Sequence, residues 1–197
     1  MKNTFLALTL AFATSAMADT FTLDPSASQV EWKAGKKIGS FHHGHIKVKS
    51  GTVETDKKGA LKSAQVVVDM KTIANEDLKE KPDMQKKLVG HLSSDDFFNV
   101  EKFPESSFAL KSVKPGKNKD EYTVSGDLTM IGKTVPVSFP ATIKANGDSL
   151  TGQGKLTIER LKWGLQYGSG SIFKALTADK IINDSFELTL NLVGKKS

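Results

Sequence analysis

"EYTVSGDLTMIGKTVPVSFPATI", residues 121–143, predicts two antiparallel strands joined by a tight turn. Apolar or small residues occupy every second position of each half, as on a strand with one buried face. Pro136 and Pro140 fall on the polar face, where they remove ladder donors, so we expect the second strand to lie at an edge or to bend. The inward positions are Tyr122, Val124, Gly126, Leu128 and Met130, then Val135, Val137, Phe139, Ala141 and Ile143.

The same alternation recurs on both sides of this hairpin. It is found in residues 26–32, 60–70, 104–113, 148–161 and 185–193. Turn signals separate these segments at 57–59, 115–118, 131–133 and 146–148. Short strands that follow one another as hairpins, with one apolar face each, predict an all-β fold: an eight-stranded antiparallel, up-and-down barrel.

Two segments break the strand pattern. In residues 74–92, Met84, Leu88 and Leu92 recur at helical spacing and Pro82 stands near a plausible helix start, which predicts a short helix covering one end of the barrel. Residues 163–180 are rich in Gly and aromatic side chains without a clear period, and we expect a loop with one helical turn around Ile172–Leu176.

The N-terminus has the features of a secretory signal peptide. Lys2 precedes an apolar run that ends in the small-x-small pattern at Ala16-Met17-Ala18. We expect residues 1–18 to be cleaved, leaving residues 19–197 as a single barrel domain in the periplasm. The chain has no cysteine, which excludes thiolate catalysis, haem attachment through thiols and cysteine metal sites.

The charge is moderately basic and evenly spread. The formal net charge is +6, and Arg160 is the single arginine among the 28 Lys and Arg residues. Lysines alternate with acidic residues along the chain, which is typical of a solvated surface and argues against a nucleic-acid partner. A transient contact with anionic membrane surfaces remains open, as does the choice between a monomer and a homodimer.

Three stretches carry a resemblance to a known family. "KLVGHLSSDDFFNVEKFPESSF", "YTVSGDLTMIGKTVPVSF" and "LTIERLKWGLQYGSGSIF" resemble segments of the YceI-like proteins, and "FTLDPSASQVEW" resembles that family's first hairpin. The resemblance covers essentially the whole chain after residue 18. It implies an exported bacterial protein with a lipocalin-like barrel that binds a small-molecule lipid: a polyisoprenoid, a quinone-like molecule or a fatty-acid-like chain. It implies no enzymatic activity and no cofactor.

The apolar faces of the predicted strands allow two interpretations. They either pack against each other in a filled core or form the wall of a cavity that holds an apolar tail; the family resemblance favours the cavity. Small inward residues would keep the barrel hollow: Gly126, Ala141, Gly152 and Gly154. The candidate wall residues are Val66, Val68, Phe108, Leu128, Met130, Phe139, Leu156, Phe186 and Leu188.

Polar and aromatic candidates lie near the predicted strand ends. Arg160 follows the inward positions of its strand, so its guanidinium would either bind an acidic head group or form an ion pair that holds the strand end. Trp163 and Tyr167 follow in the loop, where they would cover a head group. Phe97, Phe98 and Phe103 would form either an apolar lip at the barrel mouth or an anchor for the helix.

The four histidines do not form one cluster on the strand pattern. In "SFHHGHIKVKSG", residues 40–51, alternation places His42 on the inward face and directs His43 and His45 to the solvent. His42 and His91 are therefore the candidates for a head-group contact or a structural pair. They are also the weaker candidates for a metal site, since a zinc or copper site needs three or four converging ligands.

No catalytic motif accompanies these residues. The sequence lacks a Gly-x-Ser-x-Gly elbow, a His-Glu-x-x-His pair, a dinucleotide fingerprint and a phosphate loop. We therefore expect a periplasmic binding or carrier protein with a long-chain amphipathic lipid in its barrel. Two alternatives stay open: a metal-binding protein or metal-dependent enzyme that uses the histidines, and a structural or stress-related module with a filled core.

Overall fold

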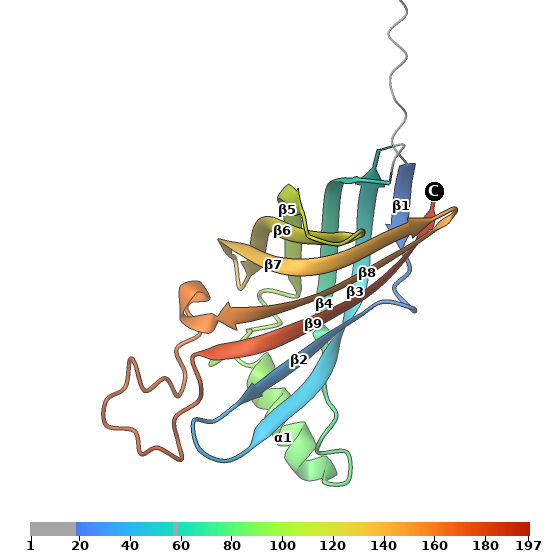
Figure 1. Ribbon diagram of the computed structural model, residues 1–197. Coiled ribbons are helices and arrows are strands. Elements are labelled where there is room, and N and C mark those ends of the chain that lie inside the picture. Colours follow the sequence, from blue (N-terminus) through green and yellow to red (C-terminus); the bar gives the residue numbers. More distant parts are fainter. Residues whose placement is uncertain (1–18, 57–58) are drawn as a thin grey trace, which may run out of the picture.

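The computed structural model describes residues 19–56 and 59–197, which form one antiparallel sheet and one α-helix (Figure 1). The predicted signal peptide, residues 1–18, and Lys57 and Lys58 of one predicted turn lie outside the described residues. The strands are β1 (Asp19–Leu23), β2 (Gln29–Gly35), β3 (Phe41–Thr55), β4 (Leu61–Asn75), β5 (Glu105–Pro115), β6 (Glu121–Met130), β7 (Lys133–Asn146), β8 (Ser149–Glu159) and β9 (Ser185–Lys196).

The nine strands of the described chain fill eight positions of a closed barrel. From β3 to β9 each strand pairs with the next, and β2 closes the ring between β9 and β3. β1 occupies the same position as β2: it pairs with residues 52–55 of β3 and 194–196 of β9, whereas β2 pairs with 41–47 and 187–191. The predicted eight-stranded antiparallel barrel is therefore confirmed, with one strand position divided in two.

The hairpin of residues 121–143 is formed by β6 and β7. The turn residues Ile131 and Gly132 both have positive φ, 43° and 73°, as a two-residue hairpin with a matching twist requires. β7 pairs with β6 through residues 133–142 but meets β8 only from Ala141 onward. Pro136 and Pro140 thus lie in the half of β7 that has no partner on the β8 side, which is the edge-like position expected for them.

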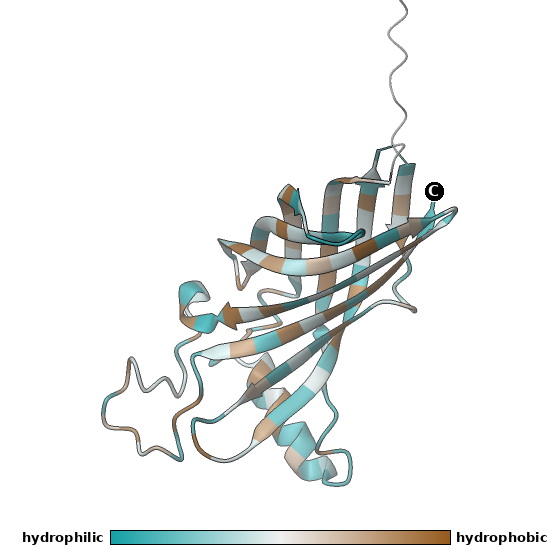
Figure 2. Ribbon diagram, in the orientation of Figure 1, coloured by the Kyte–Doolittle hydropathy of each residue, from teal (hydrophilic) through white to brown (hydrophobic). Residues whose placement is uncertain are grey.

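Side chains on the inner face of the strands form two buried clusters, and Figure 2 shows apolar and polar bands alternating along the strands. The larger cluster includes Phe21, Leu23 and Leu150 near the end where β1 and the β7–β8 hairpin lie. The smaller includes Trp32, Met70 and Ile73 near the opposite end. Burial of these apolar surfaces is the main stabilising term of the fold.

The predicted helix is α1 (Pro82–Ser93), which begins at Pro82 and lies at one end of the barrel (Figure 1). Its packing face differs from the expected one. Val89 and Leu92 pack on the smaller cluster, whereas Met84 is 54% exposed. None of the described helices is long and apolar enough to cross a membrane.

The segment after β8 is irregular, as expected, and it begins with a helical element that was not expected. A short 3₁₀ helix, η1 (Arg160–Trp163), follows β8 directly. At Ile172 and Phe173 the backbone forms only a single turn, with both amides donating to the carbonyl of Ser169. The remaining chain up to β9 is a series of turns.

Candidate functional site

An apolar cavity occupies the interior of the barrel. Its volume is about 190 Å³, well above the roughly 10–15 Å³ that holds one water molecule. All nine predicted wall residues line it: Val66, Val68, Phe108, Leu128, Met130, Phe139, Leu156, Phe186 and Leu188. The polar residues along it are Ser106, Ser107, Gln153, Arg160 and Asn183.

The middle of the barrel stays hollow because inward residues of facing strands do not fill it. Val66 and Val68 on β4 and Leu188 on β9 keep partly exposed side chains although all three line the interior. Gly152 contributes to this space, since an added Cβ there would meet only the Leu192 side chain, at 3.7 Å. A packed core would leave such residues buried, so the interpretation as a filled core does not describe this barrel.

Gly126, expected to widen the cavity, has another role. A Cβ at Gly126 would lie 2.5 Å from the ring of Phe108 and 2.4 Å from the carbonyl of Ala109. The glycine therefore makes room for the Phe108 ring and is not a wall residue. Ala141, Gly152 and Gly154 do line the cavity, as expected.

The lining also includes residues beyond those predicted. Leu190 and Leu192 continue the alternation of β9, so the pattern in residues 185–193 already predicts that they face inward. Ile182 and Asn183 lie in irregular chain before β9. No periodic pattern marks these two, because their place at the cavity depends on how distant segments cross the barrel end. Phe97 and Phe98, the candidates for a lip at the barrel mouth or an anchor of the helix, also line the cavity.

Arg160 reaches the interior side of the barrel, where its guanidinium donates hydrogen bonds to other residues of the protein. Nε donates to the carbonyl of Asn183 (2.9 Å) and Nη1 to that of Leu165 (2.6 Å). Nη2 donates to the carbonyl of Ile182 (3.3 Å) and lies 3.2 Å from Oδ1 of Asp184. Arg160 is 3% exposed, and burial lowers the pKa of its guanidinium. This geometry matches the ion pair that holds the strand end.

Trp163 belongs to the barrel wall. It is 3% exposed, packs in the larger cluster, and donates from Nε1 to the carbonyl of Leu128 at 3.1 Å. The helix η1, which carries Trp163, packs beside β7, whose first half does not pair with β8. Trp163 is not among the residues that line the cavity, so its indole stabilises the wall instead of covering a head group from within.

His91 and Tyr167 meet beside the cavity. Their ring centroids are 4.6 Å apart in an edge-to-face arrangement, and Phe97 contacts both, at 5.0 Å from His91 and 5.3 Å from Tyr167. Nε2 of His91 also lies 2.9 Å from Oδ2 of Asp96. Phe97 lines the cavity, whereas His91 and Tyr167 do not. This aromatic group therefore connects the end of α1 and the loop after η1 to the cavity wall.

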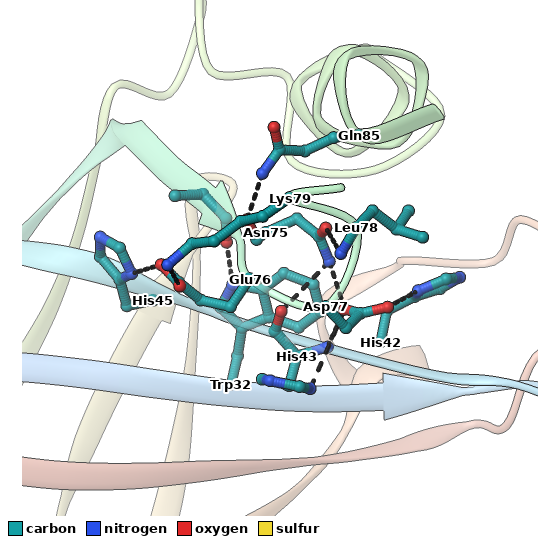
Figure 3. A network of polar contacts seen from close by, with 11 residues as sticks. Trp32, His42, His43, His45, Asn75, Glu76, Asp77, Leu78, Lys79 and Gln85 are labelled. Carbon is teal, nitrogen blue, oxygen red and sulfur yellow. Dashed lines mark hydrogen bonds and ion pairs between the residues drawn. The ribbon is translucent and has the colours of Figure 1, made fainter. Parts of the chain in front are cut away.

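The three histidines of β3 bind the acidic chain between β4 and α1 (Figure 3). Nδ1 of His42 lies 2.7 Å from Oδ2 of Asp77, and Nδ1 of His45 lies 2.9 Å from Oε1 of Glu76. The backbone amide of His43 donates to Oδ1 of Asp77 at 2.9 Å. The expectation that His45 points to the solvent was wrong, since residues 75–77 fold over it and leave its side chain 24% exposed.

His42 and His91 have separate carboxylate partners, Asp77 and Asp96. Across residues 19–56 and 59–197, no three His, Cys, Asp or Glu side chains are placed to hold a metal ion. The imidazoles of His42 and His45 instead contact the carboxylates of Asp77 and Glu76, in the chain that leads into α1. Neither His42 nor His91 lines the cavity.

The geometry agrees with comparison to known proteins. The model of the YceI-like domain family matches residues 21–194. The chain belongs to the YceI-like family. A relative in Pseudomonas putida (strain F1), named UPF0312 protein, is 34% identical over 75% of this chain and 76% of its own length. Protein YceI of Escherichia coli O6:H1 is 31% identical over the same shares.

Solved structures of other proteins share the barrel. BcnA of Burkholderia cenocepacia is 26% identical, covering 87% of this chain and 98% of its own, with a TM-score of 0.68. A domain from Saccharophagus degradans, described as polyisoprenoid binding and implicated in plant cell wall breakdown, is 15% identical, with a TM-score of 0.60. It covers 90% of this chain and 98% of its own, and at this identity the likeness concerns the fold.

Proposed function

We propose that this protein is a periplasmic carrier that holds one long-chain amphipathic lipid in its barrel. The observation that carries the proposal is the continuous apolar cavity, in which Arg160, the one charged residue of the described lining, already donates four hydrogen bonds to acceptors of the protein. An apolar tail gains about 25 cal/mol for each Å² of surface removed from water, without needing polar contacts in the barrel. Binding without catalysis and without a cofactor is part of the proposal.

The chemistry of the wall selects the class of ligand. A charged head group inside the barrel would lose its hydration, and the described lining offers it no charged side chain that is not already engaged, which is costly. The tail therefore lies inside, and the head group stays near the end of α1 and the loop of residues 163–173. A polyisoprenoid, a quinone-like molecule and a fatty-acid-like chain all meet these conditions. The polyisoprenoid binding described for the Saccharophagus degradans domain supports the first of them.

A decisive test is direct identification of a bound molecule. The full chain is expressed with residues 1–18 intact, recovered from the periplasm under non-denaturing conditions, and measured by native mass spectrometry before and after organic extraction. We expect a mass excess that matches one lipid per chain, and the extracted protein to take up one equivalent of an added isoprenoid alcohol. A protein that carries no lipid and takes up none after extraction would contradict the carrier function.

A further inference from the structure

The large apolar side chains that remain exposed gather at one end of the barrel. Among the described residues they are Ile38, Phe41, Met84, Tyr167, Ile172 and Phe173. They belong to the β2–β3 turn, the segment between η1 and β9, and α1, which lie at the same end in Figure 1. We define the rim patch as Ile38, Phe41, Tyr167, Ile172 and Phe173, which are between 43% and 61% exposed.

The two loops of the rim patch are hydrogen bonded to one another. The amide of Lys37 donates to the carbonyl of Ile181, and that of Asn183 donates to the carbonyl of Gly35, both at 2.9 Å. The amide of Ile182 donates to the carbonyl of Gly168 at 2.8 Å, next to Tyr167. The exposed apolar side chains are therefore carried by connected backbone, not by independent loops.

Lysines outnumber acidic residues in the two chain segments that carry the rim patch. Residues 33–41 and 164–184 contain five lysines but only two acidic residues, Asp179 and Asp184. Asp184 is already engaged, by the guanidinium of Arg160 at 3.2 Å and by the Ser171 hydroxyl at 2.5 Å. The lysines are Lys33, Lys36, Lys37, Lys174 and Lys180, and all five are exposed.

The rim patch also adjoins the cavity. Ala34 precedes the β2–β3 turn and lines the cavity, as do Ile182 and Asn183 in the other loop. Tyr167 contacts Phe97, which is itself a lining residue. Exposed apolar side chains with lysines around them at the end of an apolar cavity match the chemistry of a bilayer interface, where apolar groups enter the acyl boundary and cations meet phosphates.

We propose that the rim patch docks onto the surface of an anionic lipid bilayer. Ile38, Ile172 and Phe173 enter the interface while Lys36, Lys37 and Lys174 contact the phosphate groups of the phospholipids. This contact does not depend on what fills the cavity, since it uses only residues outside the barrel. Its orientation would bring the cavity end next to the acyl chains.

Vesicle flotation tests the docking directly. The full chain without its signal peptide is mixed with vesicles of phosphatidylglycerol and phosphatidylethanolamine, or with phosphatidylcholine vesicles alone. We expect binding to the anionic vesicles that decreases with salt, and little binding to the neutral ones. The double variant Lys36→Glu/Lys37→Glu should lose binding by at least about fivefold for each charge removed. The double variant Ile172→Ser/Phe173→Ser should also lose it.

Two control variants separate the rim patch from general surface properties. Lys114→Glu/Lys117→Glu makes the same charge change near the β5–β6 turn, at the opposite end of the barrel, and Met84→Ser removes an equally exposed apolar side chain from the first turn of α1. Both should retain vesicle binding, and circular dichroism should show all variants folded. Equal loss in the control variants would overturn the proposal.

The other outcome that overturns it is self-association. If wild-type protein does not float with anionic vesicles but sediments as a dimer that Ile172→Ser/Phe173→Ser converts to a monomer, the rim patch is an interface between protein chains. Flotation of the lipid-extracted protein keeps this test apart from the carrier function. Docking without any bound lipid would uphold the rim patch and contradict only the carrier proposal.

Discussion

Nδ1 of His42 lies 2.7 Å from Oδ2 of Asp77, and this contact fastens the start of β3 to the chain that leads into α1 (Figure 3). Asn75 extends the connection. Its side-chain Nδ2 donates to the backbone carbonyl of His43 at 3.1 Å, and its backbone carbonyl accepts from Nε2 of Gln85 on α1 at 2.7 Å. The helix at the barrel end is thus held by polar contacts as well as by the packing of Leu92.

Replacement of Asp77 by Asn should make the protein less stable at neutral pH and less sensitive to acid. Partial burial would raise the pKa of this carboxyl, but hydrogen bonds from the His43 amide, the His42 imidazole and Asn75 lower it from 3.8 to about 2. A lowered pKa adds stability above pH 4 that disappears as the pH falls through 2. Asp77→Asn should therefore lower the free energy of unfolding by about 2 kcal/mol at neutral pH.

Urea unfolding at neutral pH, at pH 4 and near pH 2 measures this difference. The difference in unfolding free energy between wild type and Asp77→Asn should largely close toward pH 2, where the wild-type carboxyl becomes protonated. Asp95→Asn, at an exposed position just after α1, is the control and should follow the wild-type curve. A difference in unfolding free energy that does not change with pH would show that Asp77 acts through its shape and not through its charge.

Replacement of Arg160 by Met should destabilise the barrel strongly. The change leaves the carbonyls of Leu165, Ile182 and Asn183 without this donor and Asp184 without its cation. Removing one partner of a buried pair costs about 3–5 kcal/mol. Guanidinium chloride unfolding should show this loss, whereas Lys162→Met at the exposed neighbouring site should change little. A folded Arg160→Met variant of unchanged stability that binds lipid poorly would instead point to head-group recognition.

Replacement of Gly152 by Phe should block the cavity. The position lines the cavity and leaves room for a Cβ, so a ring can enter the interior without displacing backbone. We expect loss of the bound lipid in native mass spectra while the barrel stays folded, because added apolar surface fills existing space. Gly152→Ala should retain the lipid, and so should Thr151→Phe, which adds the same ring on the outer face of β8. Lipid retained by a folded Gly152→Phe variant would argue against binding in the barrel.

Replacement of Gly44 by Ala should disrupt the pairing of β3 with β4. An added Cβ would lie 1.8 Å from the carbonyl oxygen of Ala74, which also accepts the Trp32 Nε1 hydrogen bond at 3.1 Å. The two strands would have to separate, so we expect a loss of more than about 2 kcal/mol in thermal or chemical unfolding. Gly90→Ala on α1 meets no atom within 4 Å and should instead stabilise by up to about 1 kcal/mol. Equal effects at both positions would contradict the steric argument.

Local sequence patterns predicted the strands but not the partners of charged side chains. Alternation in residues 121–143 placed Val124, Leu128 and Phe139 inward, and these side chains are buried. The same rule placed His45 outward and was wrong, because a strand period describes two faces and not what later folds over them. His45 faces Glu76, and His42 faces Asp77, from a different part of the chain.

The sequence by itself determined which residues point into the barrel, since side chains of a strand alternate between its faces whatever the strand pairs with. Only the tertiary structure decided that the interior is hollow and that the guanidinium of Arg160 forms its hydrogen bonds within the protein. Hollowness depends on whether side chains from facing strands meet across the barrel, as Val66 and Leu188 show by their partial exposure. The role of Arg160 depends on acceptors brought to it from residues 182–184.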